Sequence, residues 1–200
     1  MLKVKQLYFD YPDKSILHNT QFTVNSGTLL HIRGNNGSGK TTLLKLLAGM
    51  LNPIAGEILW NENPITQNIS TYQQNLCYVG HKTGVSQLLT VKENCHFDLI
   101  PHHSSLSITE SIKTLGLESV QDVQCGLLSV GQRRRVGLLR LLMSQAQLWL
   151  LDEPFVALDQ ETLSTIMSII NTHLEQKGVI VLTSHQPLPS KGTSIQEYCL

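Results

Sequence analysis

The segment GNNGSGKTT, residues 34–42, places three glycines directly before the apolar run LLKLLAGM. Glycine costs conformational entropy in or beside regular structure, so this density of glycine indicates that the backbone itself is needed here. Glycines allow successive N–H groups to turn inward around an anion, and the N-terminus of a following helix adds partial positive charge. Because the apolar strand TLLHIR precedes the loop, the pattern predicts a phosphate-binding turn between this strand and a helix that starts near Thr41.

The side chains of this loop indicate how phosphates would be held. Lys40 offers a full charge for the β- and γ-phosphates of a nucleotide, and Thr41 offers a hydroxyl to a Mg²⁺ ion. A glycine-rich surface loop is the competing interpretation, which the strand-to-helix context disfavours. The loop alone indicates a nucleotide without saying which reaction the protein carries out. The predicted nucleotide-binding residues are Gly34, Asn35, Asn36, Gly37, Ser38, Gly39, Lys40, Thr41 and Thr42.

Two adjacent acids follow the apolar run in QLWLLDEP, residues 147–154. A continuous apolar run is typical of a strand buried on both faces of a parallel sheet, and open α/β sheets bind ligands at the carboxyl ends of their strands. We therefore expect Asp152 to reach the Mg²⁺ ion held by Thr41, and Glu153 to act as general base on an attacking water. A strand-ending acidic turn is the alternative.

The segment LLSVGQRRRVGLL, residues 127–139, predicts a second helix start with anion-binding character. Ser129 and Gln132 have the S-x-x-Q spacing of a capping box, and Gly131 opens the backbone at the positive end of the helix. An ordinary helix start is the plainer interpretation. Since one nucleotide needs only one such loop from its own subunit, we expect the second site to close over the phosphate of a neighbouring subunit's nucleotide.

Composition limits the remaining classes of function. The chain has 200 residues, 41% of them hydrophobic, with 15 basic and 15 acidic side chains. These values predict one soluble globular domain over residues 1–200, with no sign of broad nucleic-acid binding. We expect the basic run Arg133–Arg135 to be a solvated helix face or an anion contact. The N-terminus MLKVKQLYFD predicts no signal peptide, and no stretch of about twenty apolar residues predicts a membrane span.

Cysteine and histidine spacing gives little support for a metal centre. The four cysteines show no C-x-x-C spacing, which indicates free thiols in a reducing compartment. His96, His102 and His103 lie close together and have the chemistry of metal or haem ligands, although polar loop histidines are much commoner. The cysteines are Cys77, Cys95, Cys125 and Cys199.

The order of the expected elements predicts an α/β fold. Short strands such as QFTV and EILW fill the first sixty residues, and residues from about Thr90 to Gly126 form a helical insertion interrupted by PHHSS. After it come a helix at Val130–Ser144, the strand LWLL, a helix at Gln160–Glu175 and the strand VIVLT. This alternation of strand and helix predicts a parallel sheet.

Taken together, these motifs resemble those of the ATP-binding cassette (ABC) ATPases. GNNGSGKT resembles the Walker A loop, LWLLDEP the Walker B strand, and LLSVGQ the family signature with Val130 in place of a glycine. ALD, ending at Asp159, resembles the D-loop, and TSH, ending at His185, resembles the loop of the switch histidine. Tyr11 matches the aromatic residue that stacks on adenine, or is simply a strand-end tyrosine. His81 stands where the family's Q-loop has glutamine.

The resemblance implies a fold and a shared active site. The fold is that of a P-loop NTPase, with a mostly parallel core sheet, an N-terminal antiparallel β subdomain and a helical subdomain over about residues 82–145. ATP and Mg²⁺ are the implied cofactors, and Glu153 and His185 are the implied catalytic residues. Two copies of the chain would meet head to tail, each giving its signature residues to the other's nucleotide. These signature residues are Ser129, Val130, Gly131 and Gln132.

Two further stretches resemble one branch of the family, the ATP-binding subunits of cytochrome c maturation haem exporters. VLTSHQPL matches that branch, and YVGHKTG matches it except that Lys82 and Thr83 replace glutamine and proline. The resemblance implies a peripheral subunit at the cytoplasmic face of the bacterial inner membrane, bound to integral subunits of the CcmB and CcmC type. ATP hydrolysis there would release a haem-loaded chaperone. We expect a helical segment at 81–98 to dock on these subunits through Val85 and Leu88, although local core packing explains both residues equally well.

Three alternatives can be weighed against this interpretation. An ABC transporter for another substrate would share the family motifs. A soluble ABC ATPase acting on chromosomes would carry a long coiled coil between Lys40 and Ser129, and one acting on ribosomes would carry two cassettes; the sequence shows neither. A P-loop kinase would not explain LSVGQ and the switch histidine together.

Overall fold

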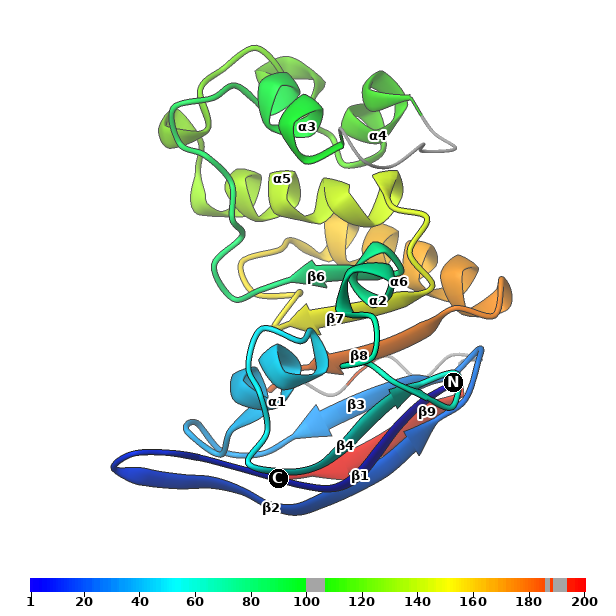
Figure 1. The fold of residues 1–200 in the computed structure, drawn as a ribbon. Helices are drawn as coiled ribbons and strands as arrows, with labels where there is room; N and C mark the ends of the chain where they lie inside the picture. The colour runs from blue at the N-terminus through cyan, green and yellow to red at the C-terminus, as the bar shows by residue number, and fades with distance from the viewer. Residues whose placement is uncertain (100–106, 186–187, 189–193) are drawn as a thin grey trace.

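The computed structural model describes residues 1–99, 107–185, 188 and 194–200, and its strands form an antiparallel and a parallel sheet (Figure 1). The antiparallel sheet contains β1 (Leu2–Tyr11), β2 (Lys14–Val24), β4 (Ala55–Trp60) and β5 (Asn63–Pro64), in the order β2-β1-β4-β5. The parallel sheet contains β3 (Leu29–Arg33), β6 (Leu76–Val79), β7 (Leu148–Asp152), β8 (Val179–Thr183) and β9 (Ile195–Cys199), in the order β6-β7-β8-β3-β9. The predicted pair of sheets is confirmed.

Helices surround the parallel sheet and extend away from it. In Figure 1, α5 lies between the sheet and the smaller helices α3 and α4. The helices are α1 (Lys40–Leu47), α2 (Ile69–Gln74), α3 (Val91–Leu99), α4 (Ile108–Thr114), α5 (Val130–Met143) and α6 (Gln160–Glu175), with 3₁₀ turns at Glu118–Val120 and Cys125–Leu127. The helix starts predicted near residues 41, 130 and 160 agree with the structure to within one residue.

Alternate residues of the central strands face two separate cores. Trp149 and Leu151 of β7 pack with residues of α5 and α6, whereas Leu148 and Leu150 pack with α1 and the antiparallel sheet. Both β7 and β8 are buried along their whole length. Burial on both faces explains their continuous apolar sequences, and it leaves polar chemistry to the ends of the strands.

The segment after β6 differs from the prediction. The helix expected over residues 81–98 starts only at Val91, and residues 81–90 form a loop. The buried side chain of Asn94 holds this loop, because its amide donates to the Ser86 carbonyl at 3.0 Å and its oxygen accepts from the Ser86 N–H at 2.8 Å. Side-chain hydrogen bonds therefore replace the helical ones in this stretch.

The arginine run at the start of α5 also differs from the prediction. Each of the three guanidinium groups donates to backbone carbonyls: Arg133 to Leu128, Arg134 to Pro154 at 3.2 Å, and Arg135 to Leu115 at 3.1 Å. Arg134 is only 6% exposed, so the expected solvated face is wrong at this position. A planar guanidinium with five N–H donors is suited to this task, because it can bind several carbonyls at once.

The described part of the chain contains no helix that is long and apolar enough to cross a membrane. The same part holds no group of three or more histidine, cysteine or acidic side chains arranged for a metal ion. The ring of His96 bonds to the carbonyl of Lys92 at 2.9 Å, while His102 and His103 fall outside the described residues. Cys77, Cys95 and Cys125 are buried and Cys199 is exposed, and no disulfide joins these four cysteines.

Candidate nucleotide site

The glycine-rich loop joins the end of β3 to the first turn of α1, as predicted. Gly37 and Gly39 have φ angles of 81° and 103°, in the left-handed region that favours glycine. A Cβ atom at Gly39 would also lie 2.6 Å from Cγ2 of Ile16. Glycine is therefore required at this position both by the backbone conformation and by close packing, and the N-terminus of α1 opens directly on the loop.

An open hollow of about 520 Å³ lies over this loop and the carboxyl end of β7. Its volume falls in the range of roughly 300–1,000 Å³ that is usual for ligand sites. It is lined by the end of β1, the start of β2, the glycine-rich loop, the first turn of α1 and the carboxyl ends of β6, β7 and β8. The lining residues are Tyr11, Lys14, Ile16, Asn36, Gly37, Gly39, Lys40, Thr41, Thr42, His81, Asp152, Glu153 and His185.

Two lysine side chains rest on carbonyl groups of the loop. Nζ of Lys40 donates to the carbonyls of Gly34 and Asn35 at 2.7 and 3.1 Å. Nζ of Lys14, a residue that the sequence analysis missed, donates to the carbonyl of Gly37 at 3.1 Å. Both positive charges thus line the hollow, and a phosphate would compete well for them because hydrogen bonds between charged groups are about twice as strong as neutral ones.

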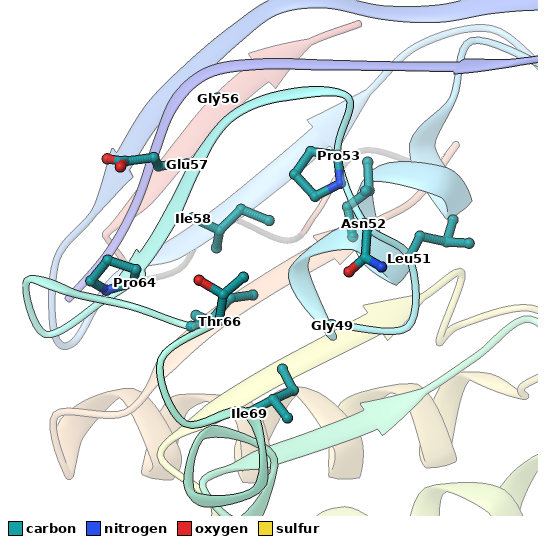
Figure 2. Close-up of a pocket in the computed structure, with 12 residues that line it drawn as sticks. Gly49, Leu51, Asn52, Pro53, Gly56, Glu57, Ile58, Pro64, Thr66 and Ile69 are labelled. Carbon is teal, nitrogen blue, oxygen red and sulfur yellow. The ribbon is translucent and has the colours of Figure 1, made fainter.

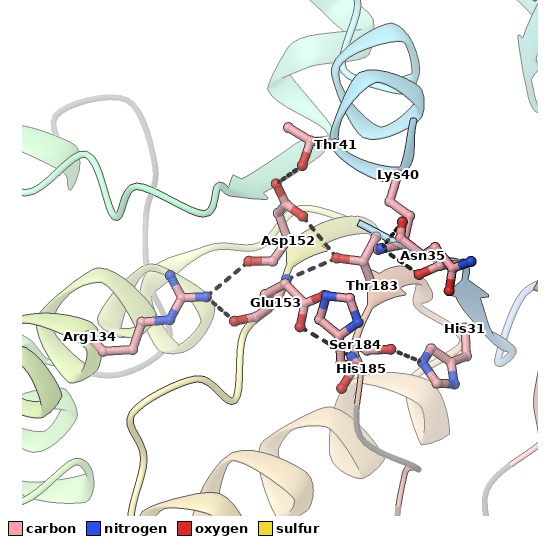
Figure 3. A network of polar contacts seen from close by, with 11 residues as sticks. His31, Asn35, Lys40, Thr41, Arg134, Asp152, Glu153, Thr183, Ser184 and His185 are labelled. Carbon is pink, nitrogen blue, oxygen red and sulfur yellow. Dashed lines mark hydrogen bonds and ion pairs between the residues drawn. The ribbon is translucent and has the colours of Figure 1, made fainter. Parts of the chain in front are cut away.

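Thr41 and Asp152, predicted to share a Mg²⁺ ion, both line the hollow, and their side chains point toward each other in Figure 3. Oγ1 of Thr41 donates to Oδ2 of Asp152 at 2.7 Å, and Oγ1 of Thr183 donates to Oδ1 at 2.9 Å. The Asp152 side chain is 1% exposed, so its carboxylate is fixed in direction. A hydroxyl and a carboxylate are the hard oxygen ligands that Mg²⁺ prefers, and this donor pair fits the ion.

Glu153 is held on the rim of the hollow next to His185. Its backbone has a φ of 50°, and its N–H donates to Oγ1 of Thr183 at 3.0 Å. Oε2 accepts from the backbone N–H of His185 at 3.3 Å, and Oε1 lies 3.4 Å from Nε2 of the His185 ring. Within the described structure, Oε1 is buried and accepts no hydrogen bond. Oε1 is therefore the carboxylate oxygen without a hydrogen bond, and it faces the His185 ring.

The charges near Asp152 also influence two neighbouring groups. Burial, followed by the charge of Asp152, raises the pKa of Tyr78 to about 12, so this phenol stays neutral. Burial lowers the pKa of the Arg134 guanidinium, while the negative charges of Asp152 and Glu153 act in the opposite direction. The site is thus an acidic pair backed by one buried cation.

Comparison with known proteins identifies the family. Residues 17–156 match the family model described as ABC transporter. Over 200 residues the chain is 50% identical to the cytochrome c biogenesis ATP-binding export protein CcmA of Legionella pneumophila (strain Lens), with all of both chains covered. The chain belongs to the CcmA family of ABC transporter ATP-binding proteins. It is also 38% identical over 203 residues to CcmA of Escherichia coli (strain K12), covering 100% of this chain and 96% of the relative.

The same comparisons confirm the expected fold and branch of this CcmA homologue. A solved bacterial ABC transporter cassette, determined as a dimer, aligns with a TM-score of 0.84 at 22% identity, over 100% of this chain and 94% of the other. The ABC ATPase resemblance and its cytochrome c biogenesis branch, both inferred from short motifs, therefore hold over the full length of the chain.

The signature segment of the CcmA homologue forms the predicted capping box but lies outside the nucleotide hollow. Oγ of Ser129 accepts from the N–H of Gln132 at 3.2 Å, and Oε1 of Gln132 accepts from the N–H of Ser129 at 2.9 Å. A Cβ at Gly131 would lie 2.9 Å from the carbonyl oxygen of Ala157, so the helix start packs tightly on the D-loop. Val130 is 64% exposed, which explains why a valine is tolerated there.

Three other predicted positions differ in how well the structure supports them. Tyr11 lines the hollow, is 42% exposed, and its ring lies nearly perpendicular to that of Phe9 with the ring centroids 5.1 Å apart. His81 lines the hollow and is exposed. Asp159 lies outside the lining and caps α6, accepting from the N–H of Thr162 at 2.8 Å, a hydrogen bond that lowers the pKa of Asp159.

His31 is a buried polar residue of β3 that the sequence analysis missed. Its ring Nε2 lies 3.1 Å from the carbonyl oxygen of Ser184, the residue before His185 (Figure 3). Because a carbonyl only accepts hydrogen bonds, Nε2 must carry the proton. The strand that leads into the glycine-rich loop is thus tied to the start of the switch-histidine loop.

A second hollow, of about 460 Å³, lies at the opposite end of α1 from the glycine-rich loop (Figure 2). Its lining is largely apolar, and its one ionisable side chain in the described structure, Glu57, lies 3.6 Å from Nζ of Lys5. This lining offers no group of reactive side chains, so the chemistry belongs to the first hollow.

Proposed function

We propose that this chain hydrolyses Mg²⁺-ATP as the nucleotide-binding subunit of a cytochrome c biogenesis exporter. The observation that carries the proposal is the hydrogen bond between Thr41 and Asp152 in the lining of a hollow that Lys40 and Glu153 also line. A phosphate-binding loop, a metal-ligand pair and a carboxylate that can act as general base are the groups that phosphoryl transfer to water requires.

The roles of the chain's own residues follow from their geometry. Backbone N–H groups of the glycine-rich loop and the N-terminus of α1 bind the phosphates, and Lys40 and Lys14 leave the loop carbonyls to neutralise them. Thr41 and Asp152 would hold the Mg²⁺ ion, which supplies positive charge against the β- and γ-phosphates. Glu153 takes the proton from the attacking water, and His185 keeps the carboxylate in place.

The complete site requires a second copy of the chain. The capped, solvent-facing start of α5 at Ser129–Gln132 does not line the nucleotide hollow of its own subunit. In a head-to-tail dimer this helix end would meet the γ-phosphate bound to the partner's glycine-rich loop. The dimeric state of the related cassette supports this arrangement.

The membrane partner would contact the loop after β6. Leu88 is 80% exposed, on a loop that Asn94 holds in place. Val85 instead packs partly against the core, as the alternative of local packing suggested. A rigid loop with one protruding apolar side chain is suited to insertion into an apolar recess of an integral subunit. We place the subunit peripherally at the cytoplasmic face of the inner membrane, with partners of the CcmB and CcmC type.

The proposal also specifies the cargo: ATP hydrolysis would drive the release of a haem-loaded chaperone. The test is to isolate the chain from native membranes, identify the integral subunits that accompany it, and measure ATPase activity and haem content of the released chaperone. The wild-type chain should copurify with integral subunits, hydrolyse ATP and release haem-loaded chaperone. The Lys40→Ala variant should still copurify with the integral subunits but should neither hydrolyse ATP nor release the chaperone. ATP hydrolysis without any haem dependence would indicate a transporter for another substrate. Recovery of an active ATPase without membrane partners would indicate a soluble ABC ATPase.

A further inference from the structure

The Arg134 side chain uses all of its hydrogen-bond donors on the backbone of two distant segments. Nε donates to one carbonyl at 3.2 Å, Nη1 to two at 3.1 and 3.3 Å, and Nη2 to two more, the first at 3.0 Å. A guanidinium has five N–H groups, so none is left over. The acceptors are the carbonyl oxygens of Gly80, His81, Asp152, Glu153 and Pro154.

These contacts fix the course of the backbone at the catalytic carboxylate. Glu153 has a left-handed φ of 50°, which is uncommon for a residue with a side chain and persists only where the surroundings hold it. Thr183 binds the N–H of Glu153 at 3.0 Å, and Arg134 binds its carbonyl, as Figure 3 shows. Both peptide groups of the residue are therefore held, and the direction of its side chain depends on both contacts.

The same helix also carries the loop after β6. A Cβ at Gly137 would lie 2.7 Å from Cβ of Thr83, and a Cβ at Gly84 would lie 3.2 Å from Nη2 of Arg140. Positions 134, 137 and 140 follow one another at three-residue intervals, so they lie along one side of α5. The loop that begins at Gly80 therefore rests on α5 over two turns and should move with it.

A hollow of about 530 Å³ opens beside this junction, and its lining includes His81, Val85, Arg134 and Glu153. His81 and Glu153 also line the nucleotide hollow. A group that enters this hollow beside Arg134 would press on the loop after β6, whose first carbonyls are bound to Arg134. Arg134 thus lies between a surface that is open to a partner and the residue proposed to activate water.

We propose that Arg134 is a positioning residue that ties helix α5 and the loop at Gly80–His81 to the backbone of Glu153. It contacts no reacting atom; it acts through the orientation of the Glu153 carboxylate. A shift of α5 or of the loop would therefore turn the base toward the attacking water or away from it. The inference rests on the proposed function, because it takes Glu153 to be the general base.

The test is Arg134→Lys in the chain purified together with its membrane subunits. Lysine keeps the charge but has only three donors at one point, so it cannot bind five carbonyls. We expect the Kd for ATP to stay within about 3-fold of wild type, since the phosphate contacts are untouched. A misplaced catalytic group costs on the order of 10²-fold in rate, so kcat should fall by about that factor, and stimulation by the membrane subunits should be lost.

Arg135→Lys is the matched control, because Arg135 also binds two carbonyls, but those of Leu115 and Gly116 at the end of α4. It should keep wild-type kcat and stimulation. Adding Arg134→Lys to Glu153→Gln should lower the remaining rate by less than about 3-fold. The effects of two substitutions on the rate are not additive when both act through the same group. A purely structural role would lower the rate in both backgrounds alike.

The possible failures can be told apart. A wild-type complex without ATP hydrolysis would contradict the proposed function itself. An active wild type with a fully active Arg134→Lys variant, or with equal losses in ATP affinity and kcat, would overturn only the role of Arg134. If Arg134→Lys does not fold, Arg134→Gln, which leaves no buried charge, replaces it under the same criteria.

Discussion

Oγ1 of Thr41 donates a hydrogen bond of 2.7 Å to Oδ2 of Asp152, a residue 111 positions further along the chain. This contact joins the first turn of α1 to the carboxyl end of β7. The other oxygen of the carboxylate accepts from Thr183 at 2.9 Å, so both oxygens of Asp152 have fixed directions. The two elements that would hold the metal ion are therefore already positioned next to each other, and metal binding need not supply the free energy of bringing them together.

Asp152→Asn tests the metal role directly. The amide has nearly the same shape, and its oxygen can keep one of the two threonine hydrogen bonds, but the negative charge is lost. We expect ATP binding in EDTA to change by less than about 3-fold, and hydrolysis in Mg²⁺ to fall by about 10²-fold or more, because a metal ion supplies several kcal/mol of charge stabilisation. A Mg²⁺ titration of ATPase activity measures the effect.

The control for that experiment is Asp122→Asn, which removes an acid that is 73% exposed and paired with Lys92 at 3.0 Å. It should leave the Mg²⁺ dependence unchanged. Equal Mg²⁺ dependence in wild type and Asp152→Asn would show that Asp152 is not a ligand.

Lys40→Ala tests the phosphate site. Lys40 is only 8% exposed, and its ammonium group already lies on the glycine-rich loop. Its replacement by alanine therefore removes a positive charge from the position where the phosphates would bind. Hydrogen bonds to charged groups contribute about 1.5–3 kcal/mol each, so the Kd for ATP should rise at least about 10-fold, and by about 10²-fold or more if the ammonium contacts two phosphate oxygens. Calorimetry measures it, with Lys45→Ala on the same helix as the control. Near-normal affinity of Lys40→Ala would refute the assignment of the loop.

The parts of this site that were predictable from sequence are those with local signals. The glycine spacing before Lys40, the two acids after an apolar strand and the Ser129–Gln132 capping box each depend on a few adjacent residues. Their conformations follow from backbone freedom, strand burial and helix capping, which operate over short distances. The structure placed all of these elements where the sequence indicated.

Two of the elements that were not predicted lack strong local signals. β9 reads IQEYC, has no continuous apolar run and pairs only with β3 among the described strands, so its place depends on that partner. The short helix α2 is capped by Asn68 and anchored by the hydroxyl of Tyr72, which donates to the carbonyl of Leu47. These contacts are tertiary, and a single sequence does not reveal them.

The burial of Arg134 could have been predicted from its spacing to the leucines that follow it. Leu138 and Leu141 follow it at the four- and seven-residue intervals that define one face of a helix, and both are buried. A charged residue in register with that apolar face must itself be buried and must find acceptors. The three-arginine run hid this pattern because its members face different sides of α5.

His173 predicts how stability depends on pH. Its ring stacks on Trp149 at 3.8 Å, and burial lowers its pKa from 6.5 to about 4. Between these values the unfolded chain binds a proton that the folded chain excludes, so stability falls as the pH drops from about 6.5 to 4. One pKa unit corresponds to about 1.4 kcal/mol, so the loss should reach at most about 3.5 kcal/mol. Denaturant unfolding across this range measures it.

His173→Gln removes the titrating ring and should flatten that part of the pH profile. His96→Gln, at an exposed histidine of α3, should leave the wild-type profile unchanged. If both variants keep the same slope as wild type, His173 does not control the acid side of the stability curve.

Leu88→Ser tests the docking surface. The side chain is 80% exposed on a loop held by Asn94, so its replacement should spare the fold and remove an apolar contact with the partner. Burying a leucine contributes about 1.5–3 kcal/mol, so recovery of the membrane subunits should weaken about 10-fold or more. Ile54→Ser is the control, because Ile54 is 67% exposed in a different loop. Equal partner recovery in both variants would exclude Leu88 from the interface.

Glu153→Gln separates nucleotide binding from hydrolysis. Glutamine has the same size and can occupy the same backbone conformation, but it cannot take a proton, so the rate should fall by about 10²–10⁴-fold while ATP still binds. Because ligand that binds only the closed dimer shifts the equilibrium by mass action, Glu153→Gln should elute as a dimer with Mg²⁺-ATP and as a monomer without it. Glu161→Gln, at an exposed acid in the first turn of α6, should behave as wild type and dissociate after each hydrolysis.

Adding Ser129→Arg to Glu153→Gln places bulk at the capped start of α5, outside the nucleotide hollow of its own subunit, and should abolish the dimer without weakening ATP binding. A Glu153→Gln chain that binds ATP tightly yet stays monomeric, even with its membrane partners present, would show that the site is complete within one subunit.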